Sequence, residues 1–169
     1  MQARARNQDS MRHVISLLVE NKVGVLARIT SLISGRGFNI DSLAVGETET
    51  PSLSRITIVV RGDDAILEQV RKQLSKLIDV IKVIDFTNEE FVERDLMMVK
   101  VNCPIGKRGE IIEIVDIFRG KIVDVGQKDL IVEIAGTEDK LDAMLSLLRP
   151  YGIKELVQTG SIAIARGMK

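Results

Sequence analysis

The chain has 169 residues, of which 45% are hydrophobic and 28% are charged. Its 24 basic and 24 acidic residues cancel, so no net field draws it to nucleic acid. No apolar stretch approaches the length of a membrane span, and the first ten residues lack the apolar segment of a secretory signal. We therefore expect a cytoplasmic protein with a disordered leader over residues 1–11. The single cysteine, Cys103, excludes an internal disulfide and fits a reducing compartment.

The first half of the chain predicts the order β-α-β-β-α-β. Apolar residues alternate in the strand over residues 54–60, which places Ile56, Ile58 and Val60 on one side of a sheet. Further strands are predicted over residues 12–20, 38–45 and 79–86. A helix over residues 24–34 and a second helix capped by Asp63 each show one apolar face. These faces comprise Leu26, Ile29, Leu32 and Ile33 in the first helix, and Ile66, Val70, Leu74 and Leu77 in the second.

The second half repeats this order with little sequence identity. Strands are predicted over residues 96–102, 121–125 and 129–135, with a final extended segment over residues 153–165. Helices are predicted over residues 110–118 and after the cap Thr137. The fold class is therefore α+β, with two ferredoxin-like βαββαβ domains in tandem. The first spans residues 12–87, a polar hinge spans residues 88–94, and the second spans residues 95–169.

Each half is close to the size at which an isolated domain is only marginally stable. A four-stranded sheet with both helices on one face also leaves its other face and its edges uncovered. Pairing with a second copy would cover such surfaces, so we expect at least a homodimer.

The turn from the first strand to the first helix is the best candidate for a binding site. The backbone N–H groups of Gly24 and Val25 can bind a carboxylate, because N–H groups at a helix start lack partners. The side chain of Asn21 can bind a second polar group, and Val23 and Leu26 offer apolar walls. Such a turn suits a free amino acid. The alternative is a tight turn without a ligand, since Asn and Gly favour turns in any protein.

Longer stretches of the sequence carry a family resemblance. VISLLVENKVGVLARITSLISGRGFNIDSLAV at residues 14–45, PSLSRIT at residues 51–57 and ERDLMMVK at residues 93–100 resemble the small regulatory subunit of acetolactate synthase. Residues 67–74, 117–124, 135–137 and 140–142 are similar to it as well. The resemblance implies that the first domain is an ACT domain, a small amino-acid-sensing module. It also implies an effector between two paired ACT domains, where the turn of one chain faces Asn39 and Ile40 of the other.

The resemblance further implies a partner, the large catalytic subunit of acetolactate synthase. Thiamine diphosphate, Mg²⁺ and FAD are expected on that subunit, and no cofactor is expected on this chain. The chain itself would be non-catalytic, would activate its partner and would confer feedback inhibition by a branched-chain amino acid, most often valine. An apolar pocket separates valine, leucine and isoleucine too weakly for the sequence to choose among them.

The segment over residues 47–55 is our candidate for contact with the catalytic subunit. It is polar, and Pro51 stiffens it. Glu47, Thr48, Pro51 and Arg55 are the residues expected to make this contact, and charge reversal at Arg55 should weaken activation. An ordinary hairpin loop is the alternative.

Other functions have weaker support. A free-standing ACT sensor that regulates another enzyme or transcription remains the alternative. His13 and Cys103 lack the partners of a catalytic or metal site, so we expect structural roles for both. An RNA-binding protein of the same plan would carry aromatic residues on its third strand, and residues 55–60 carry none. The glycine pair Gly106 and Gly109 joins a strand to a helix, unlike the helix-to-helix loop of KH domains.

Overall fold

The structure is a computed structural model that describes residues 11–167. These residues form two compact units. The first comprises residues 11–92 together with residues 163–167, and the second comprises Glu93–Ile162. Apart from Met11, the predicted leader lies outside the described residues. Within residues 11–167, no helix is both long and apolar enough to cross a membrane.

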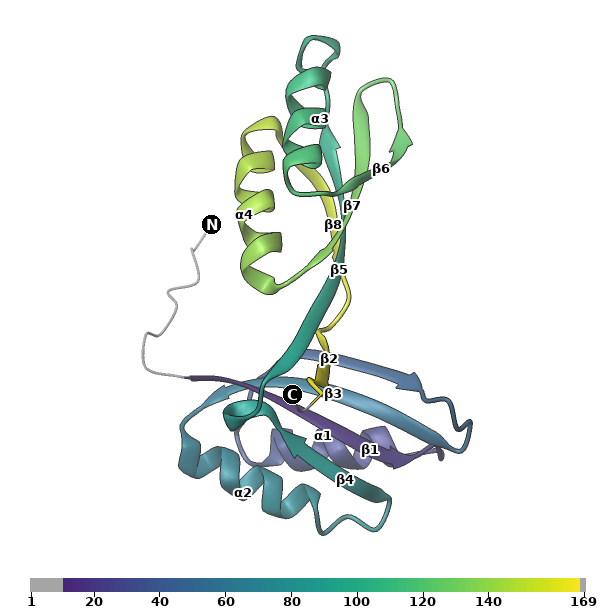
Figure 1. The fold of residues 1–169 in the computed structure, drawn as a ribbon, viewed down its shortest axis with the longest axis vertical. Coiled ribbons are helices and arrows are strands. Elements are labelled where there is room, and N and C mark those ends of the chain that lie inside the picture. The colour runs from purple at the N-terminus through teal and green to yellow at the C-terminus, as the bar shows by residue number, and fades with distance from the viewer. Residues whose placement is uncertain (1–10, 168–169) are drawn as a thin grey trace. The chain divides into compact units, whose positions relative to one another are not determined.

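The first unit is a four-stranded antiparallel sheet with two helices on one face (Figure 1). The strands lie in the order β2-β3-β1-β4, so β2 and β4 are the edges. Its elements are β1 (Met11–Glu20), α1 (Val25–Gly35), β2 (Ile40–Glu47), β3 (Leu53–Gly62), α2 (Asp64–Leu74), β4 (Val80–Asp85) and the 3₁₀ turn η1 (Phe86–Asn88).

The second unit repeats this arrangement, with strand order β6-β7-β5-β8. The prediction of two ferredoxin-like βαββαβ domains in tandem is confirmed. The elements of the second unit are β5 (Phe91–Asn102), η2 (Ile105–Lys107), α3 (Arg108–Ile117), β6 (Lys121–Val125), β7 (Asp129–Gly136), α4 (Glu138–Leu148), η3 (Arg149–Tyr151) and β8 (Ile153–Gln158). They are followed by β9 (Ile162–Ala165), which pairs with β5.

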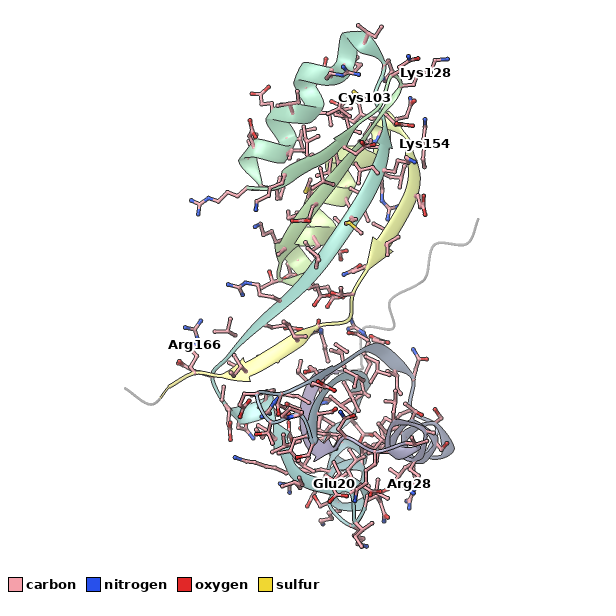
Figure 2. The ribbon with its side chains drawn as sticks, turned by 90° about the vertical axis from the view of Figure 1, so that its right-hand side faces the viewer. Glu20, Arg28, Cys103, Lys128, Lys154 and Arg166 are labelled. Atoms are coloured by element: carbon pink, nitrogen blue, oxygen red, sulfur yellow. The ribbon has the colours of Figure 1, made fainter. Side chains whose placement is uncertain are left out.

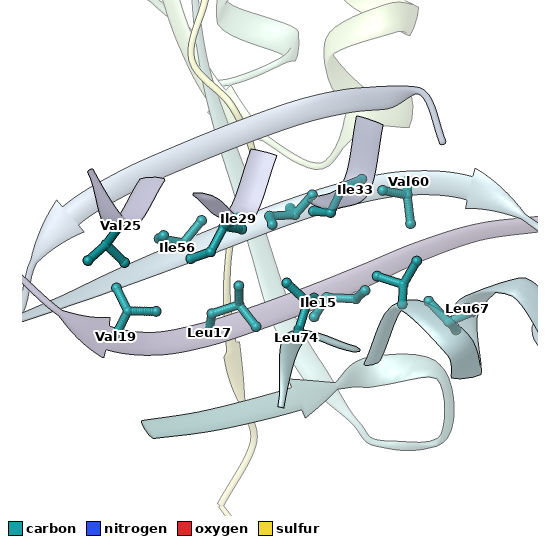
Figure 3. Packing of buried hydrophobic residues seen from close by; sticks show 12 residues of the cluster. Ile15, Leu17, Val19, Val25, Ile29, Ile33, Ile56, Val60, Leu67 and Leu74 are labelled. Carbon is teal, nitrogen blue, oxygen red and sulfur yellow. The ribbon is translucent and has the colours of Figure 1, made fainter. Parts of the chain in front are cut away.

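Alternate residues of the strands build the core of the first unit against the two helices (Figure 3). Ile56, Ile58 and Val60 are all buried there, as predicted. The predicted helix faces were partly wrong: Val25 is buried while Leu26 is exposed, and Leu67 is buried while Ile66 is exposed. A helical period accommodates either neighbour, and packing against the sheet selects one of them. The predicted N-cap of α2 is confirmed, since Asp63 Oδ1 accepts the Ile66 N–H at 2.8 Å.

The connections between the units differ from the predicted bounds. Strand β5 begins at Phe91, within the segment predicted as a hinge. The predicted extended segment over residues 153–165 is two strands, β8 and β9, rather than one. The chain leaves β8 where Thr159 Oγ1 accepts the Leu96 N–H at 3.0 Å and the Ser161 hydroxyl donates to Asp95.

Most of the last strand, β9, belongs to the first unit from Ala163 onward, although the prediction assigned residues 95–169 to the second. Ala163 is 6% exposed and packs with Val14, Val59 and Phe86 in a small apolar cluster. Val14 and Val59 pair across β1 and β3, on the face of the first sheet that carries no helix. The Arg166 N–H also donates to Glu90 O at 2.8 Å. We call this helix-free side of the first sheet the open face; β9 covers one end of it.

Exposed polar side chains join α3 to η3 in the second unit. Glu110 accepts from Lys107 Nζ at 2.8 Å and from the Tyr151 hydroxyl at 2.9 Å. These two hydrogen bonds, that from Lys107 first, lower the pKa of Glu110. The same contacts raise the pKa of Lys107 and that of Tyr151. Because the pKa of Glu110 is lower in the folded state, its contribution to stability is present above the unfolded pKa and is lost as pH falls through the folded pKa.

Replacing Ala163 with Asp tests whether β9 is part of the first unit. A carboxylate in the Val14–Val59–Phe86 cluster would be desolvated without a cation, so we expect the free energy of unfolding to fall by about 2 kcal/mol. Urea unfolding measures this loss, and the amides of Val14 and Val59 should exchange faster with solvent. Ala165→Asp is the matched control, since Ala165 is exposed. Equal stability of the two variants would contradict the assignment.

Replacing Tyr151 with Phe removes one of the two hydrogen bonds to Glu110. Because that bond favours the ionised carboxylate, we expect the pKa of Glu110 to rise toward its usual value. Side-chain NMR titration measures the shift. The pKa of Asp129 is lowered chiefly by its hydrogen bond from Lys154, so it should not change in this variant and provides an internal control. No rise at Glu110 would contradict this account.

Candidate functional site

Strand β1 ends at Glu20, and an exposed turn leads to α1 at Val25. Gly24 is the N-cap residue, with a φ of 84° that favours glycine, and no side chain caps the helix. The Val25 N–H donates weakly to Lys22 O, at 3.4 Å. Among the described residues, no acceptor is found for the N–H groups of Gly24, Leu26 and Ala27. The free donors are therefore those of Gly24, Leu26 and Ala27 rather than that of Val25.

The Asn21 side chain ties this turn to the segment between β2 and β3. Asn21 Nδ2 donates to Glu47 Oε1 and to Pro51 O, both at 3.0 Å, and the Asn21 N–H donates to Ser52 O at 2.8 Å. Both amide protons of the side chain are thus used, which leaves Asn21 Oδ1 as a free acceptor within the described residues. The turn and the loop over residues 48–52 consequently form one hydrogen-bonded assembly.

The charged groups beside the turn are mostly paired. Lys22 contacts Glu20, and the hydrogen bond and charge of Glu20 raise the pKa of Lys22. Arg28 Nη2 lies 2.6 Å from Asp79 Oδ2, and Figure 2 shows Glu20 and Arg28 at the same end of the unit. Glu47 is different: among the described residues it has no cationic partner, only the amide of Asn21. The turn thus presents free N–H donors and, beside them, an uncompensated carboxylate.

The apolar residues predicted to line the site are exposed beside these donors. The Val23 side chain is fully exposed and that of Leu26 is 39% exposed, whereas the Val25 side chain lies in the core. A Cβ added at Gly24 would meet no atom within 4 Å, so the space in front of the turn is open. The single chain provides one apolar wall but no enclosed pocket there.

Asn39 and Ile40 lie at the opposite end of the first sheet. Ile40 pairs with Val60 on β3, whereas Glu47, which contacts Asn21, pairs with Ser54. Six residues of an extended strand separate these positions by about 20 Å. The Asn39 side chain donates to Asp41 Oδ1 at 3.1 Å. The structure therefore does not bring Asn39 and Ile40 to the turn of the same chain.

The four residues predicted to contact a partner occupy different settings. Glu47 ends β2 and is exposed, and Pro51 lies in the loop. Thr48 stabilises the loop itself, since its hydroxyl accepts the Thr50 N–H at 3.1 Å. Arg55 is not a loop residue: it lies in β3, half-buried, and Nη1 donates to Ser16 Oγ at 3.1 Å.

Sequence reasoning missed the bonds from Asn21 to Glu47 and Pro51. Nothing local indicates them, because 26 and 30 residues separate the partners along the chain.

Two other candidates have structural roles. His13 is buried, with Nε2 3.1 Å from Gly62 O and Nδ1 3.3 Å from Thr87 Oγ1. Cys103 is buried in the core of the second unit. Over residues 11–167, no cluster of His, Cys, Asp and Glu could hold a metal ion.

Comparison with known proteins identifies close relatives of the whole chain. Residues 15–82 match the family model of the AHAS small subunit-like ACT domain, and residues 94–167 match that of the small subunit of acetolactate synthase. The chain is 56% identical over 159 residues to the probable acetolactate synthase small subunit of Archaeoglobus fulgidus, covering 94% of this chain and 99% of that one. It is 52% identical over 155 residues to the acetolactate synthase small subunit of Mycolicibacterium smegmatis, covering 92% of this chain and 91% of that one.

A solved structure is similar over nearly the same span. The crystal structure of the acetolactate synthase small subunit from Thermotoga maritima is 42% identical in sequence, with a TM-score of 0.86. The similarity covers 94% of this chain and 99% of that chain.

Replacing Asn21 with Ala tests the connection between the turn and the loop. The loss of two side-chain hydrogen bonds should raise the exchange rates of the Thr50 and Leu53 amides about tenfold, since these amides depend on the closed loop. Hydrogen exchange followed by NMR measures the change. Asn39→Ala is the matched control, because among the described residues the Asn39 side chain hydrogen-bonds to Asp41 and not to the loop. Unchanged exchange in the Asn21 variant would show that the loop is held independently of the turn.

Proposed function

The chain belongs to the family of acetolactate synthase small subunits, and we propose that it activates the catalytic subunit and makes that subunit sensitive to feedback inhibition by a branched-chain amino acid, with valine as the first candidate. The observation that carries the effector site is the turn over residues 21–26. There, unpaired N–H donors lie beside acceptors that have no cation.

A free amino acid needs these two kinds of group close together. Its carboxylate suits the N–H groups of Gly24, Leu26 and Ala27, where the partial positive charge of the helix start adds to the hydrogen bonds. Its ammonium group suits oxygen acceptors, and the turn offers Asn21 Oδ1 and the Glu47 carboxylate, which accepts a hydrogen bond from the Asn21 amide. The exposed side chains of Val23 and Leu26 favour an aliphatic side chain over a charged one.

A second copy of the chain would complete the pocket. Strand β2 is an edge strand with an unpaired side, and antiparallel pairing of two β2 strands places the start of one beside the end of the other. Asn39 and Ile40 of the second copy would then lie next to Glu47 and, through it, Asn21. This pairing accounts for the separation of about 20 Å within one chain, because the two halves of the site come from different copies.

Regulation then requires that the effector favour one state of the loop over residues 48–52. Asn21 holds this loop through hydrogen bonds to Glu47 and Pro51. A ligand that binds Asn21 or Glu47 would therefore change the hydrogen bonds of the loop directly. Inhibition follows if the loop contacts the catalytic subunit in only one of its states. A coupling free energy of about 1–3 kcal/mol would suffice.

We assign the chemistry to the catalytic subunit. Thiamine diphosphate, Mg²⁺ and FAD belong there in this proposal, and the present chain takes part through binding alone. Its buried polar side chains, such as His13 and Ser16, are held by hydrogen bonds within the first unit.

Replacing Gly24 with Asp tests the effector site in a reconstituted complex with the catalytic subunit. The added carboxylate would repel the effector's carboxylate at the helix start, so activation should persist while the valine concentration for half-inhibition rises at least about tenfold. Gly24→Asn is the matched control: Asn has nearly the shape of Asp and tolerates the same φ, but it carries no charge. Steady-state acetolactate formation over a valine series measures both effects.

Three outcomes would decide the matter. Inhibition of the Asp variant at the parent's valine concentration would place the site elsewhere. Equal loss in the Asp and Asn variants would assign the effect to filled space rather than to charge. A wild-type chain that neither activates the catalytic subunit nor binds valine, leucine or isoleucine in calorimetry would refute the proposed function.

A further inference from the structure

The open face of the first sheet has a covered end and an uncovered one. β9 and its cluster of Val14, Val59 and Phe86 cover the end near the start of β1. Toward the other end, four residues lie side by side across the strands. They are Lys82 of β4, Leu18 of β1, Arg55 of β3 and Gly46 of β2, which we call the Arg55 row.

The two cations of the Arg55 row have no acidic partner among the described residues. The Arg55 side chain makes one hydrogen bond, from Nη1 to Ser16 Oγ at 3.1 Å, and the exposed Lys82 side chain makes no hydrogen bond or ion pair within the described residues. The next residue of β1 on this face is Glu20, and its carboxylate is bound to Lys22. Arg28, Lys72 and Arg61 of the same unit each contact a carboxylate, which Arg55 and Lys82 do not.

The Arg55 guanidinium is also held in place. The bond to Ser16 uses one of its five N–H donors, and the stem of Arg55 is half-buried along the sheet. A guanidinium fixed this way loses little freedom when it binds a carboxylate with its remaining donors. Lys82 lies two strands away, at a backbone separation of about 10 Å, with the half-buried Leu18 between them.

We propose that the Arg55 row binds an acidic segment of the catalytic subunit. The proposal rests on the proposed function and extends it by naming the surface and the charge of the partner. The charge of the row selects a carboxylate-bearing partner, and Gly46 leaves backbone accessible beside Arg55. The row also adjoins the loop over residues 48–52, since Gly46 precedes Glu47 and Arg55 follows Ser54. An effector bound at Asn21 and Glu47 would therefore act on the edge of this contact.

The test measures association of the full-length chain with its catalytic subunit by surface plasmon resonance, together with activation in the acetolactate assay. Lys82→Glu and Arg55→Glu should each raise the dissociation constant about tenfold, and the double variant more, since each charge reversal places an acid opposite an acid. Raising NaCl from 50 to 500 mM should weaken the wild-type complex more than the complex of the Arg55→Gln, Lys82→Gln double variant. Lys72→Glu is the matched control, because Lys72 lies on α2 and is paired with Glu68.

Because Arg55 contributes a bond to Ser16, circular dichroism and the urea midpoint check that its variants fold. The Lys82 side chain makes no hydrogen bond or ion pair within the described residues, so its variant keeps the proposal testable by itself. Wild-type affinity and activation in Lys82→Glu and in a folded Arg55→Glu would overturn the proposal and leave the proposed function intact. Equal weakening by Lys72→Glu would also overturn it, because the effect would then be one of net charge. Failure of the wild-type chain to bind the subunit would instead count against the proposed function.

Discussion

Both helices of the first unit pack on one face of its sheet. The other face therefore has to be covered by other segments or left exposed to solvent and partners. The core lies between the sheet and the helices, where Ile15, Leu17 and Ile58 are completely buried. The opposite face and the two edge strands have no helix to cover them. Apolar residues on the open face must be covered by another segment of the chain, and polar residues there are available to partners.

Strand β9 covers part of the open face. Ala163 of β9 covers Val14 and Val59, although almost the whole second unit lies between β4 and β9 in the sequence. The remainder of the open face carries Arg55 and Lys82, whose charges tolerate water. The covered and uncovered ends of one sheet thus have different chemistry, which is the basis for assigning a partner contact to the uncovered end.

The Asn21 side chain connects the proposed effector site to the loop over residues 48–52. Its bonds to Glu47 and Pro51 connect a turn with free N–H donors to a loop that borders the Arg55 row. Binding at the turn and binding at the loop would therefore share hydrogen-bonding groups, and shared groups make two equilibria depend on each other. A site of this kind requires no long pathway through the core, because the two surfaces meet at one residue.

Local sequence patterns determined the elements of this protein and their order. Alternation in residues 54–60 identified β3 and its buried side, and Asp63 marked the start of α2, because both signals depend only on neighbours in the chain. The helix faces were less certain, since Leu67 and Ile66 both fit a period of 3.6 residues and only contact with the sheet decides between them. The sequence also indicated the turn over residues 21–26, because the end of a strand, a glycine and the start of a helix are contiguous there.

Only the tertiary structure decided which distant residues meet. The bond from Asn21 to Glu47 and the alignment of Lys82 with Arg55 depend on strand register, and the burial of Ala163 depends on the return of β9 to the first sheet. Register is fixed by the summed packing of whole strands and leaves no mark in the residues around any one contact. The predicted contact residue Arg55 shows the difference: its charge was evident from the sequence, but its place on the open face was not.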